Sequence, residues 1–365
     1  MNKKKIALVG YRLNRGGAER VAAILSVFFH KKGLDVHHII VIDDIAYPYS
    51  GTVANLGKLK NKSNGVFNKI KRLVALRKYL NEHNFDFIID FRFRIKPIQE
   101  LLVARFVYKA KTIFTVHSAK LDSYMPDQTF LTKWMYANSF KVVSITQDMQ
   151  RMIEKKHGLE NVITIYNPIN IQEVKEKAST EISLDFEYII GVGQYDTDVK
   201  QFDKLIYAYS KSILPNKNIA LVILGEGSKK EALINIAQQN GVANLVHFLG
   251  FKNNPYKYIK RAKFFVLSSS HEGMPMVMLE ALACGTPAVS FNCKTGPNEI
   301  IIDKENGLLV EDQNIDSLTN SMNLFISDNE LYKRCKSQAL SSVERFSLER
   351  IGKQWLELMN IDKTC

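Results

Sequence analysis

Short apolar runs of three to seven residues alternate with amphipathic segments along most of the chain. Such runs are typical of strands buried on both faces of a parallel sheet, whereas apolar residues recurring every three or four positions predict helices. We expect one set of strands at residues 6–9, 36–42, 87–89, 112–116, 142–145 and 162–166, and a second at 188–192, 220–224, 245–248, 264–267 and 288–291. Helical patterns lie between them, for example at residues 18–32, 67–81 and 228–239.

The regular alternation of strands and helices predicts an α/β protein with parallel sheets. A chain of 365 residues is long enough for two domains, each with its own core. The expected boundary is Asn167-Pro168, which places one domain at residues 1–167 and the other at residues 168–346. The polar residues 172–183 are interpreted as a linker or as a first irregular piece of the second domain, and the apolar periodicity of residues 347–359 predicts a terminal helix.

Composition is typical of a globular protein and argues against a membrane-spanning or a disulfide-rich one. An apolar content of 46% and a charged content of 24% are ordinary for a soluble globular chain. The longest apolar runs, such as residues 219–224, are far too short to span a bilayer. The four cysteines show no metal-ligand spacing, which favours a reducing compartment and makes the cytoplasm the expected location.

Positive charge is concentrated in the first half of the chain. Residues 1–167 carry 28 Lys and Arg against 13 Asp and Glu, a net charge of +15, whereas the remainder carries −2. The stretch from Lys58 to Lys78 holds eight bases and no acid. Charge of one sign on one domain favours an anionic partner, which is a membrane surface, a lipid phosphate or a nucleic acid. A basic face that is merely solvated is the alternative.

Two glutamates flank a predicted helix start in the second half of the chain. Pro275 suits the first helical turn, where its missing amide proton costs no hydrogen bond, and Gly285 is a usual helix stop. Glu272 lies in the preceding loop, and Glu280 lies about one and a half turns inside the helix. Helix N-terminal amides attract phosphate, and carboxylates accept hydrogen bonds from hydroxyls. The pattern therefore suits a phosphate between two polyols, as in a sugar nucleotide.

The run Glu272-Gly273-Met274-Pro275, with Glu280 eight residues after the first glutamate and then Ala281-x-x-x-Gly285-x-Pro287, resembles the retaining glycosyltransferases of family 4 that build bacterial surface polysaccharides. The resemblance implies the GT-B fold, in which two Rossmann-like domains face each other across a cleft. It assigns a terminal crossing helix at about 347–365 to the first domain, which would be the acceptor side. It implies transfer of a hexose or N-acetylhexosamine from a nucleotide-diphosphate sugar, expected to be UDP-linked, to a glycan or lipid-linked acceptor. Neither a metal nor another cofactor is expected.

The resemblance also assigns roles in the second domain. Glu272 and the backbone after it would hold the donor sugar and diphosphate, and Glu280 would hold the ribose hydroxyls. Metal-free transferases need fixed cations because charge builds on the departing phosphate. Lys200 is the expected cation, but Gln194 stands where the family usually has arginine, and the spacing between the two is one residue longer. The predicted donor-binding residues of this domain are Gln194, Lys252, Gly273, Met274, Pro275, Met276 and Glu280, and Glu272 and Lys200 are predicted to be catalytic.

Two motifs of the first domain carry further expectations. The run Gly16-Gly17-Ala18-Glu19 resembles the family's loop over the donor diphosphate, where glycines allow a close backbone approach. His117 lies just past the end of a predicted strand, where open α/β sheets bind ligands. The family has a cleft-lining histidine at this place, so the resemblance predicts that His117 is catalytic.

The remaining candidates concern the acceptor. Arg92 and Arg94 follow the strand at residues 87–89, where a pair of guanidinium groups suits an acceptor phosphate. Surface arginines between buried phenylalanines are an equal alternative. The bases Lys69, Lys71, Arg72 and Lys78 predict docking of the first domain on an anionic membrane, which places the protein peripherally at the inner face of the cell membrane.

Two other functions are compatible with the same sequence. A UDP-sugar 2-epimerase would share the architecture but would need no anionic docking face, so the basic first domain argues against it. A non-enzymatic basic module that binds nucleic acid would favour aromatic residues interleaved with the bases, and only Phe67 and Tyr79 lie near. We therefore expect a nucleotide-sugar donor and no nucleic acid as partners.

Overall fold

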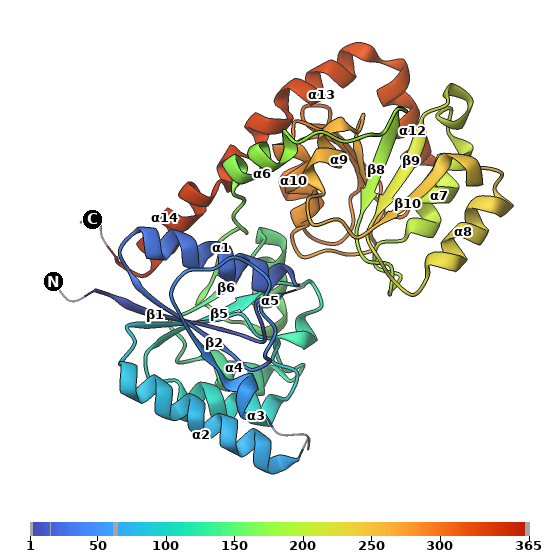
Figure 1. Cartoon of the computed structure of the whole chain (residues 1–365). Helices are drawn as coiled ribbons and strands as arrows, with labels where there is room; N and C mark the ends of the chain where they lie inside the picture. The colour runs from blue at the N-terminus through green and yellow to red at the C-terminus, as the bar shows by residue number, and fades with distance from the viewer. Residues whose placement is uncertain (1–2, 15, 61–64, 362–365) are drawn as a thin grey trace. The chain divides into compact units, whose positions relative to one another are not determined.

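The computed structural model describes residues 3–14, 16–60 and 65–361 (Figure 1). The chain divides into two compact units. Unit 1 comprises Met1–Pro168 together with Leu348–Cys365, and unit 2 comprises Ile169–Ser347. Each unit is a parallel sheet with helices packed on it, so the prediction of an α/β protein with two Rossmann-like sheets is confirmed.

The described part of unit 1 forms a seven-stranded sheet in the order β3-β2-β1-β4-β5-β6-β7, and every pair is parallel. Its strands are β1 (Lys5–Gly10), β2 (Asp35–Ile40), β3 (Thr52–Asn55), β4 (Phe87–Asp90), β5 (Lys111–Val116), β6 (Lys141–Ser144) and β7 (Val162–Thr164). The strand order reverses between β1 and β4. Ligands of open α/β sheets bind beyond the carboxyl ends of the strands at such a reversal.

The helices of unit 1 are α1 (Gly17–Lys31), α2 (Val66–His83), α3 (Pro97–Leu102), α4 (Thr129–Tyr136), α5 (Gln147–His157) and α14 (Leu348–Leu358). They are joined by the short 3-10 helices η1 (Leu56–Leu59) and η3 (Leu121–Ser123) and by the π-helix η2 (Val103–Val107). Figure 1 shows α1 on one face of the sheet and α2 on the other. Helix α14 packs against α1, and a Cβ atom on Gly352 would lie 2.4 Å from the ring of Phe28. This close approach requires glycine and lets Trp355 enter the core of unit 1.

The described part of unit 2 forms a six-stranded parallel sheet in the order β10-β9-β8-β11-β12-β13. Its strands are β8 (Tyr188–Val192), β9 (Ala220–Leu224), β10 (Val246–Gly250), β11 (Phe265–Leu267), β12 (Ala288–Phe291) and β13 (Gly307–Val310). Its helices are α6 (Ile171–Ala178), α7 (Phe202–Lys211), α8 (Lys230–Gln239), α9 (Tyr256–Arg261), α10 (Met276–Ala283), α11 (Pro297–Ile300), α12 (Ile315–Ser327) and α13 (Asn329–Ser342). The strand order reverses between β8 and β11, which marks the expected ligand position in this unit.

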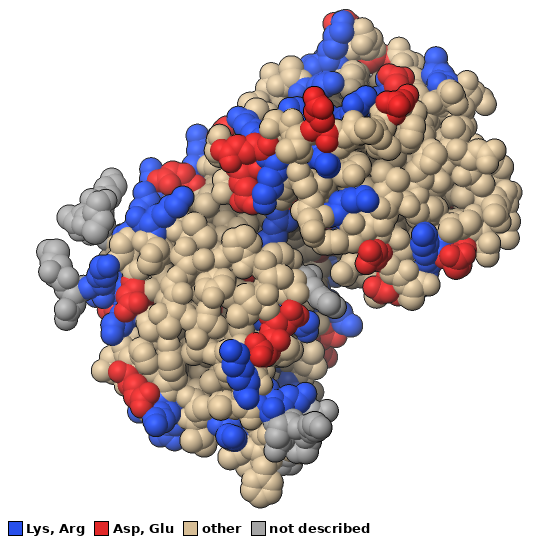
Figure 2. Space-filling view, in the orientation of Figure 1, with Lys and Arg blue, Asp and Glu red and all other residues tan. Residues whose placement is uncertain are grey.

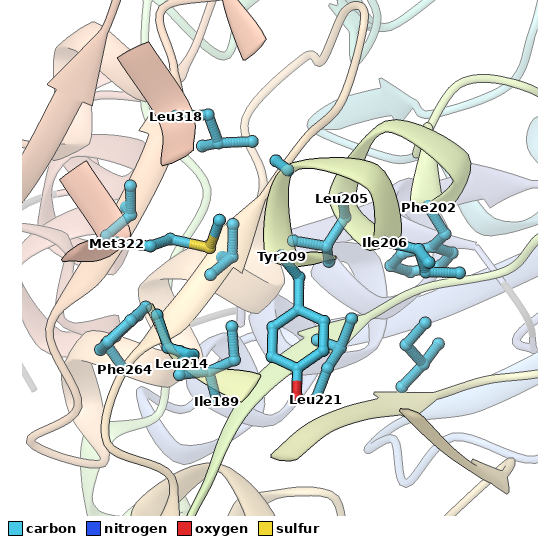
Figure 3. Close-up of a cluster of buried hydrophobic side chains, with 14 of the residues drawn as sticks. Ile189, Phe202, Leu205, Ile206, Tyr209, Leu214, Leu221, Phe264, Leu318 and Met322 are labelled. Atoms are coloured by element: carbon cyan, nitrogen blue, oxygen red, sulfur yellow. The ribbon is translucent and has the colours of Figure 1, made fainter. Parts of the chain in front are cut away.

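One large hydrophobic cluster stabilises unit 2 (Figure 3). Helix α7 buries Leu205, Ile206 and Tyr209 against the sheet, and Leu318 and Met322 of α12 pack beside them. The Tyr209 hydroxyl donates to the carbonyl of Ile219 at 2.9 Å, so this polar group is satisfied inside the core. This packing holds the sheet rigid, and the loops at its carboxyl edge start from it.

The prediction of a linker or an irregular piece at residues 172–183 is wrong for the first part of that stretch. Helix α6 occupies Ile171–Ala178, and its residues Ile171, Val174 and Ala178 are buried. These side chains recur at intervals of three and four, which is one face of a helix. The Asn170 side chain accepts a hydrogen bond from the Glu173 amide and so caps the helix. Polar residues separate these three positions, so the sequence pattern did not predict this short helix.

Candidate active site

The strand reversal of unit 2 brings two loops together. The loop after β8 carries Lys200, and the loop after β11 carries Glu272. The Lys200 ammonium lies 2.7 Å from Glu272 Oε1, with side-chain exposures of 21% and 12%. Backbone contacts hold the loops in place, since Ser268 Oγ donates to the Lys200 carbonyl at 2.7 Å and the Ser270 amide donates to the Val199 carbonyl at 2.8 Å. A fixed, mostly buried ion pair therefore lies at the carboxyl edge of the sheet.

Helix α10 begins directly after this ion pair. Pro275 is its N-cap residue rather than its first helical residue, and Gly285 with φ of +76° follows its end. No side chain among the described residues caps α10. The Met278 amide donates to the Pro275 carbonyl at 3.0 Å, whereas the amides of Met276 and Val277 lie too early in the helix to have an intrahelical acceptor. Pro275 itself has no amide proton, so it offers no hydrogen bond to a phosphate. The helix nevertheless begins four residues after Glu272, and free amides at a helix N-terminus suit an anion.

Glu280 lies on the inner side of α10, with only 4% of its surface exposed. The Tyr256 hydroxyl donates to Glu280 Oε1 at 3.4 Å. A buried carboxylate is retained only where hydrogen-bond donors surround it. Tyr256 therefore helps to hold this buried carboxylate in place. Sequence reasoning missed Tyr256, because no spacing connects it with Glu280.

A third loop supports the segment before α10. Thr295 Oγ1 donates to the Glu272 carbonyl at 2.5 Å and to the Gly273 carbonyl at 3.3 Å. The next residue, Gly296, has φ of +96°, and a Cβ atom there would lie 2.6 Å from the Gly273 carbonyl oxygen. Only glycine allows this approach. Sequence reasoning also missed Thr295, although the neighbouring helix start at Pro297 was a signal for it.

The other predicted donor residues of unit 2 lie on neighbouring loops. Gln194 follows β8 and is exposed. A Cβ atom on Gly225, after β9, would lie 1.9 Å from the Gly193 carbonyl oxygen, so the backbone beside Gln194 is tightly packed. Lys252 follows β10 and is half-buried. These residues share the carboxyl edge of the sheet with Lys200 and Glu272, and their roles stay predictions.

The glycine loop of unit 1 leads into α1. Gly16 is the N-cap residue, and open space lies beside Gly17, because a Cβ atom added there would have no neighbour within 4 Å. At Gly16 an added Cβ atom would lie 1.8 Å from Glu19 Oε2, because this carboxylate folds back over the loop. Burial raises the pKa of Glu19. The loop therefore offers exposed backbone at a helix N-terminus, beside a partly desolvated carboxyl group.

His117 follows β5 in unit 1. Its ring contacts Phe91 with a centroid distance of 5.5 Å, and neither ring nitrogen has a hydrogen-bond partner among the described residues. The residue as a whole is partly exposed, whereas both nitrogens are buried. Burial, together with the charge of Arg94, lowers the pKa of His117 to about 3. The imidazole is therefore neutral at physiological pH, and its role in catalysis stays a prediction.

The prediction that Arg92 and Arg94 hold an acceptor phosphate needs correction. Arg92 makes two hydrogen bonds to Asp90, at 3.0 and 2.7 Å, and one to Glu100 at 3.0 Å. Arg94 is 1% exposed and donates to the Tyr136 hydroxyl and to backbone carbonyls. Although burial opposes ionisation, Arg92 keeps the pKa of Asp90 below its usual value. Both guanidinium groups are occupied inside the unit and act as structural anchors.

The predicted membrane-facing bases lie on α2, and they differ in exposure and in hydrogen bonding. Lys69, Lys71 and Lys78 are exposed. Arg72 instead donates from Nε to the Asn68 carbonyl at 3.2 Å and from Nη1 to the Val41 carbonyl at 3.1 Å. Arg72 therefore connects α2 to the residues after β2 rather than facing solvent. Lys62, which belongs to the same basic stretch, lies outside the described residues.

The structure groups the predicted site residues by unit. Lys200, Glu272 and Glu280 belong to unit 2, whereas the glycine loop and His117 belong to unit 1. In the residues that the structure describes, no cluster of three His, Cys, Asp or Glu side chains could hold a metal ion. In that same part of the chain, no helix is both long enough and apolar enough to cross a bilayer.

Both halves of the chain match known families. Residues 15–173 match the family described as Glycosyltransferase Family 4, and residues 172–341 match the one described as Glycosyl transferases group 1. The chain is 28% identical over 370 residues to the N-acetylgalactosamine-N,N'-diacetylbacillosaminyl-diphospho-undecaprenol 4-alpha-N-acetylgalactosaminyltransferase of Campylobacter jejuni, covering 98% of this chain and 99% of the relative. It is 33% identical over 268 residues to an uncharacterized glycosyltransferase of Methanocaldococcus jannaschii, covering 68% of each.

Solved structures share the fold. The Anabaena Alr3699/HepE structure in complex with UDP superposes with a TM-score of 0.79 at 18% identity, over 98% of this chain and 100% of that one. The structure of TarM, a protein of S. aureus, superposes with a TM-score of 0.78 at 16% identity, over 99% of each chain. Together with the relatives and the two parallel sheets, these matches show that the chain belongs to the family 4 glycosyltransferases and has the GT-B fold.

Proposed function

We propose that this glycosyltransferase moves a hexose or N-acetylhexosamine from a UDP-sugar to a lipid-linked or glycan acceptor with retention of anomeric configuration. The observation that carries the proposal is the 2.7 Å pair of Lys200 and Glu272 beside the uncapped start of α10. A cation, a carboxylate and helix amides at one sheet edge match the diphosphate and hydroxyl groups of a sugar nucleotide.

In the proposed reaction, Lys200 and the first amides of α10 stabilise the negative charge that develops on the departing UDP. Glu272 accepts hydrogen bonds from hydroxyls of the transferred sugar, and Glu280 accepts them from the ribose. The acceptor hydroxyl attacks from the face that the leaving group vacates, and a diphosphate oxygen takes its proton. No step in this sequence requires a metal ion.

The names of relatives support the choice of acceptor. The Campylobacter relative is named for a diphospho-undecaprenol acceptor, and a Staphylococcus aureus relative, 28% identical over 226 residues, is a poly(ribitol-phosphate) alpha-N-acetylglucosaminyltransferase. A relative from Erwinia amylovora, 23% identical over 361 residues, serves amylovoran biosynthesis. We propose from these names that the chain acts in surface polysaccharide biosynthesis, at the cytoplasmic face of the cell membrane.

The proposal is tested by donor binding followed by product analysis. UDP and the matching UDP-sugar are expected to raise the melting temperature, because a ligand of the native state stabilises it, whereas GDP-sugars are expected to have little effect. With an accepted acceptor, proton NMR of the new linkage is expected to show the anomeric configuration of the donor. An inverted product would exclude the retaining mechanism, and absence of stabilisation by any UDP-sugar would exclude the donor class.

Replacing Glu280 with alanine is expected to weaken UDP binding by about 1–3 kcal/mol, because a charged hydrogen bond to the ribose is lost. Isothermal titration calorimetry with UDP measures this change. Glu280→Gln is the matched control, since the amide oxygen still accepts one hydrogen bond and should recover part of the affinity. Because Glu280 is buried, melting curves of both variants must first show a folded protein. Unchanged UDP affinity in folded Glu280→Ala would reject the ribose assignment.

A further inference from the structure

Large apolar side chains are exposed on one region of unit 1. Of the sixteen large apolar residues that are exposed in the described residues, ten lie between positions 67 and 134. They are Phe67, Ile70 and Val74 on α2, Phe93 and Ile95 before α3, Ile98 and Leu102 on α3, Phe106 on η2, and Phe130 and Trp134 on α4. Contiguous exposed apolar surface on a folded chain marks an interaction site.

Eight of these residues form outward-facing stripes on α2, α3, η2 and α4, which bury another face. Phe93 and Ile95 lie in the loop before α3, and the Phe93 ring packs on Tyr11 and Tyr124. On α2, Phe67, Ile70 and Val74 recur at intervals of three and four, while Leu76 and Leu80 are buried. On α4, Phe130 and Trp134 are 69% and 52% exposed, while other α4 residues are buried in the unit. The outward stripes are therefore additional to the stripes that fold the unit, and no described residue of this chain covers them.

The elements that carry the stripes are neighbours. Helix α3 leads into η2, η2 packs against α2 and α4, and α3 packs against α4. The amino groups of Lys69 on α2 and Lys96, next to α3, lie close enough that mutual repulsion lowers the pKa of Lys69. The stripes therefore belong to one surface, which we call the α2–α4 surface.

The α2–α4 surface is basic as well as apolar. Helices α2, α3 and α4 and the π-helix η2 contain seven Lys and Arg residues and only two acids, Glu82 and Glu100. Glu100 is 4% exposed and bonds to Arg92, so it contributes no negative charge at the surface. Figure 2 shows blue Lys and Arg side chains along the edge of unit 1 where α2 runs in Figure 1. Lys96, next to α3, adds a further exposed base.

We propose that the α2–α4 surface binds an anionic lipid bilayer, with its apolar side chains inserted among the acyl chains near the headgroups and its bases on the lipid phosphates. Aromatic and aliphatic residues flanked by Lys and Arg are the usual composition of an interfacial membrane anchor. A second copy of this chain is a poorer occupant, because two such surfaces face to face would bring bases together. This inference does not rest on the proposed reaction.

Trp134 provides a direct test. The chain contains two tryptophans, and Trp355 is buried in the core of unit 1, whereas Trp134 is 52% exposed on α4. Subtracting the emission of Trp134→Phe from that of the parent isolates the signal of Trp134. With vesicles of equal parts phosphatidylglycerol and phosphatidylcholine, this signal is expected to shift to shorter wavelength and to be quenched by lipids brominated on the acyl chains. An unshifted, unquenched signal would overturn the proposal.

Substitutions distinguish insertion of the apolar side chains into the bilayer from attraction between the bases and the lipid phosphates. Phe67→Gln, Ile70→Gln and Val74→Gln combined are expected to lower vesicle partition at least about tenfold, because three apolar side chains no longer enter the bilayer. Lys69→Gln, Lys71→Gln and Lys78→Gln combined are expected to lower it about a hundredfold at low salt. Added salt is expected to weaken vesicle binding by the unsubstituted protein without abolishing it, because the apolar side chains still insert. The apolar variant binds through charge alone, so salt is expected to abolish its vesicle binding. Tyr207→Gln with Ile302→Gln, exposed residues of unit 2, is the matched control and is expected to bind like the parent.

The remaining outcomes are equally decisive. If the folded apolar variant binds vesicles as well as the unsubstituted protein, insertion of these side chains is overturned. The proposal is also overturned if the unsubstituted protein does not bind vesicles but forms a dimer that the apolar substitutions dissociate. In that case the α2–α4 surface is an interface between copies. Thermal stabilisation by UDP, measured on every variant, reports the donor site in unit 2. It separates a failure of the membrane proposal from a failure of the proposed reaction.

Discussion

Replacing Glu272 with glutamine is expected to reduce sugar transfer about a hundredfold to a thousandfold while leaving UDP affinity nearly unchanged. Glutamine keeps the shape of the side chain and one hydrogen-bond acceptor, but it removes the charge that faces Lys200 at 2.7 Å. Loss of one preorganised group of the transition state typically has an effect of this size. UDP carries no transferred sugar, so its binding does not report the lost contact. Initial rates of UDP release, together with calorimetry of UDP, measure the two effects.

An exposed glutamate provides the control for Glu272. Glu305 lies in unit 2 between α11 and β13, and Glu305→Gln removes the same charge from the surface. This variant is expected to retain parental turnover. Parental turnover in Glu272→Gln itself would remove Glu272 from the reaction, and a large loss of UDP affinity would place its carboxylate at the nucleotide rather than at the sugar.

Replacing Lys200 with alanine is expected to lower turnover by a similar factor and also to weaken UDP binding, because the fixed cation at the diphosphate is lost. Lys204→Ala is the matched control, since Lys204 lies on α7 and bonds to Gln313. Rates and calorimetry with UDP distinguish the two lysines. A fully active Lys200→Ala enzyme would show that another residue is the phosphate cation.

The exposed Gln194 allows a test of compensation at this position. Gln194→Arg supplies the charge that the family usually has there, so it is expected to tighten UDP binding in the parent. In the Lys200→Ala background it is expected to restore part of the lost turnover. If it does neither, the side chain at position 194 does not reach the diphosphate.

Much of the fold was predictable because parallel strands covered on both faces are uninterrupted apolar runs. The bounds of β8, β9 and β12 were predicted to the residue. Two strands were not predicted, β3 and β13. β3 is an edge strand whose residues Thr52 to Asn55 are partly exposed, so its sequence lacks the apolar run that marks the central strands. β13 contains Gly307, where a Cβ atom would lie 2.5 Å from the Ala288 carbonyl oxygen, and glycine is a poor signal for a strand.

Local sequence predicted the position of Glu272 and Glu280 relative to α10, because both residues lie within one loop and helix. Their partners were not predictable in the same way. Lys200 lies 72 positions from Glu272, and Tyr256 lies 24 positions from Glu280. Arg94 was assigned to the acceptor because it follows a strand at the edge of the sheet where ligands bind, yet its partner Tyr136 is 42 positions away. Burial by distant residues is a property of the folded chain, and one sequence does not display it.

The packing of α14 on α1 has a consequence for how the protein is made. Unit 1 begins with β1 but needs Ile351 and Trp355 to complete its core, and the whole of unit 2 is translated between them. Unit 2 is continuous in the chain, so it is able to fold as soon as it leaves the ribosome. Unit 1 must wait with Phe28 and its neighbours uncovered until Leu348 and the residues after it emerge. A nascent chain stalled before that point would expose a large apolar surface to chaperones and proteases.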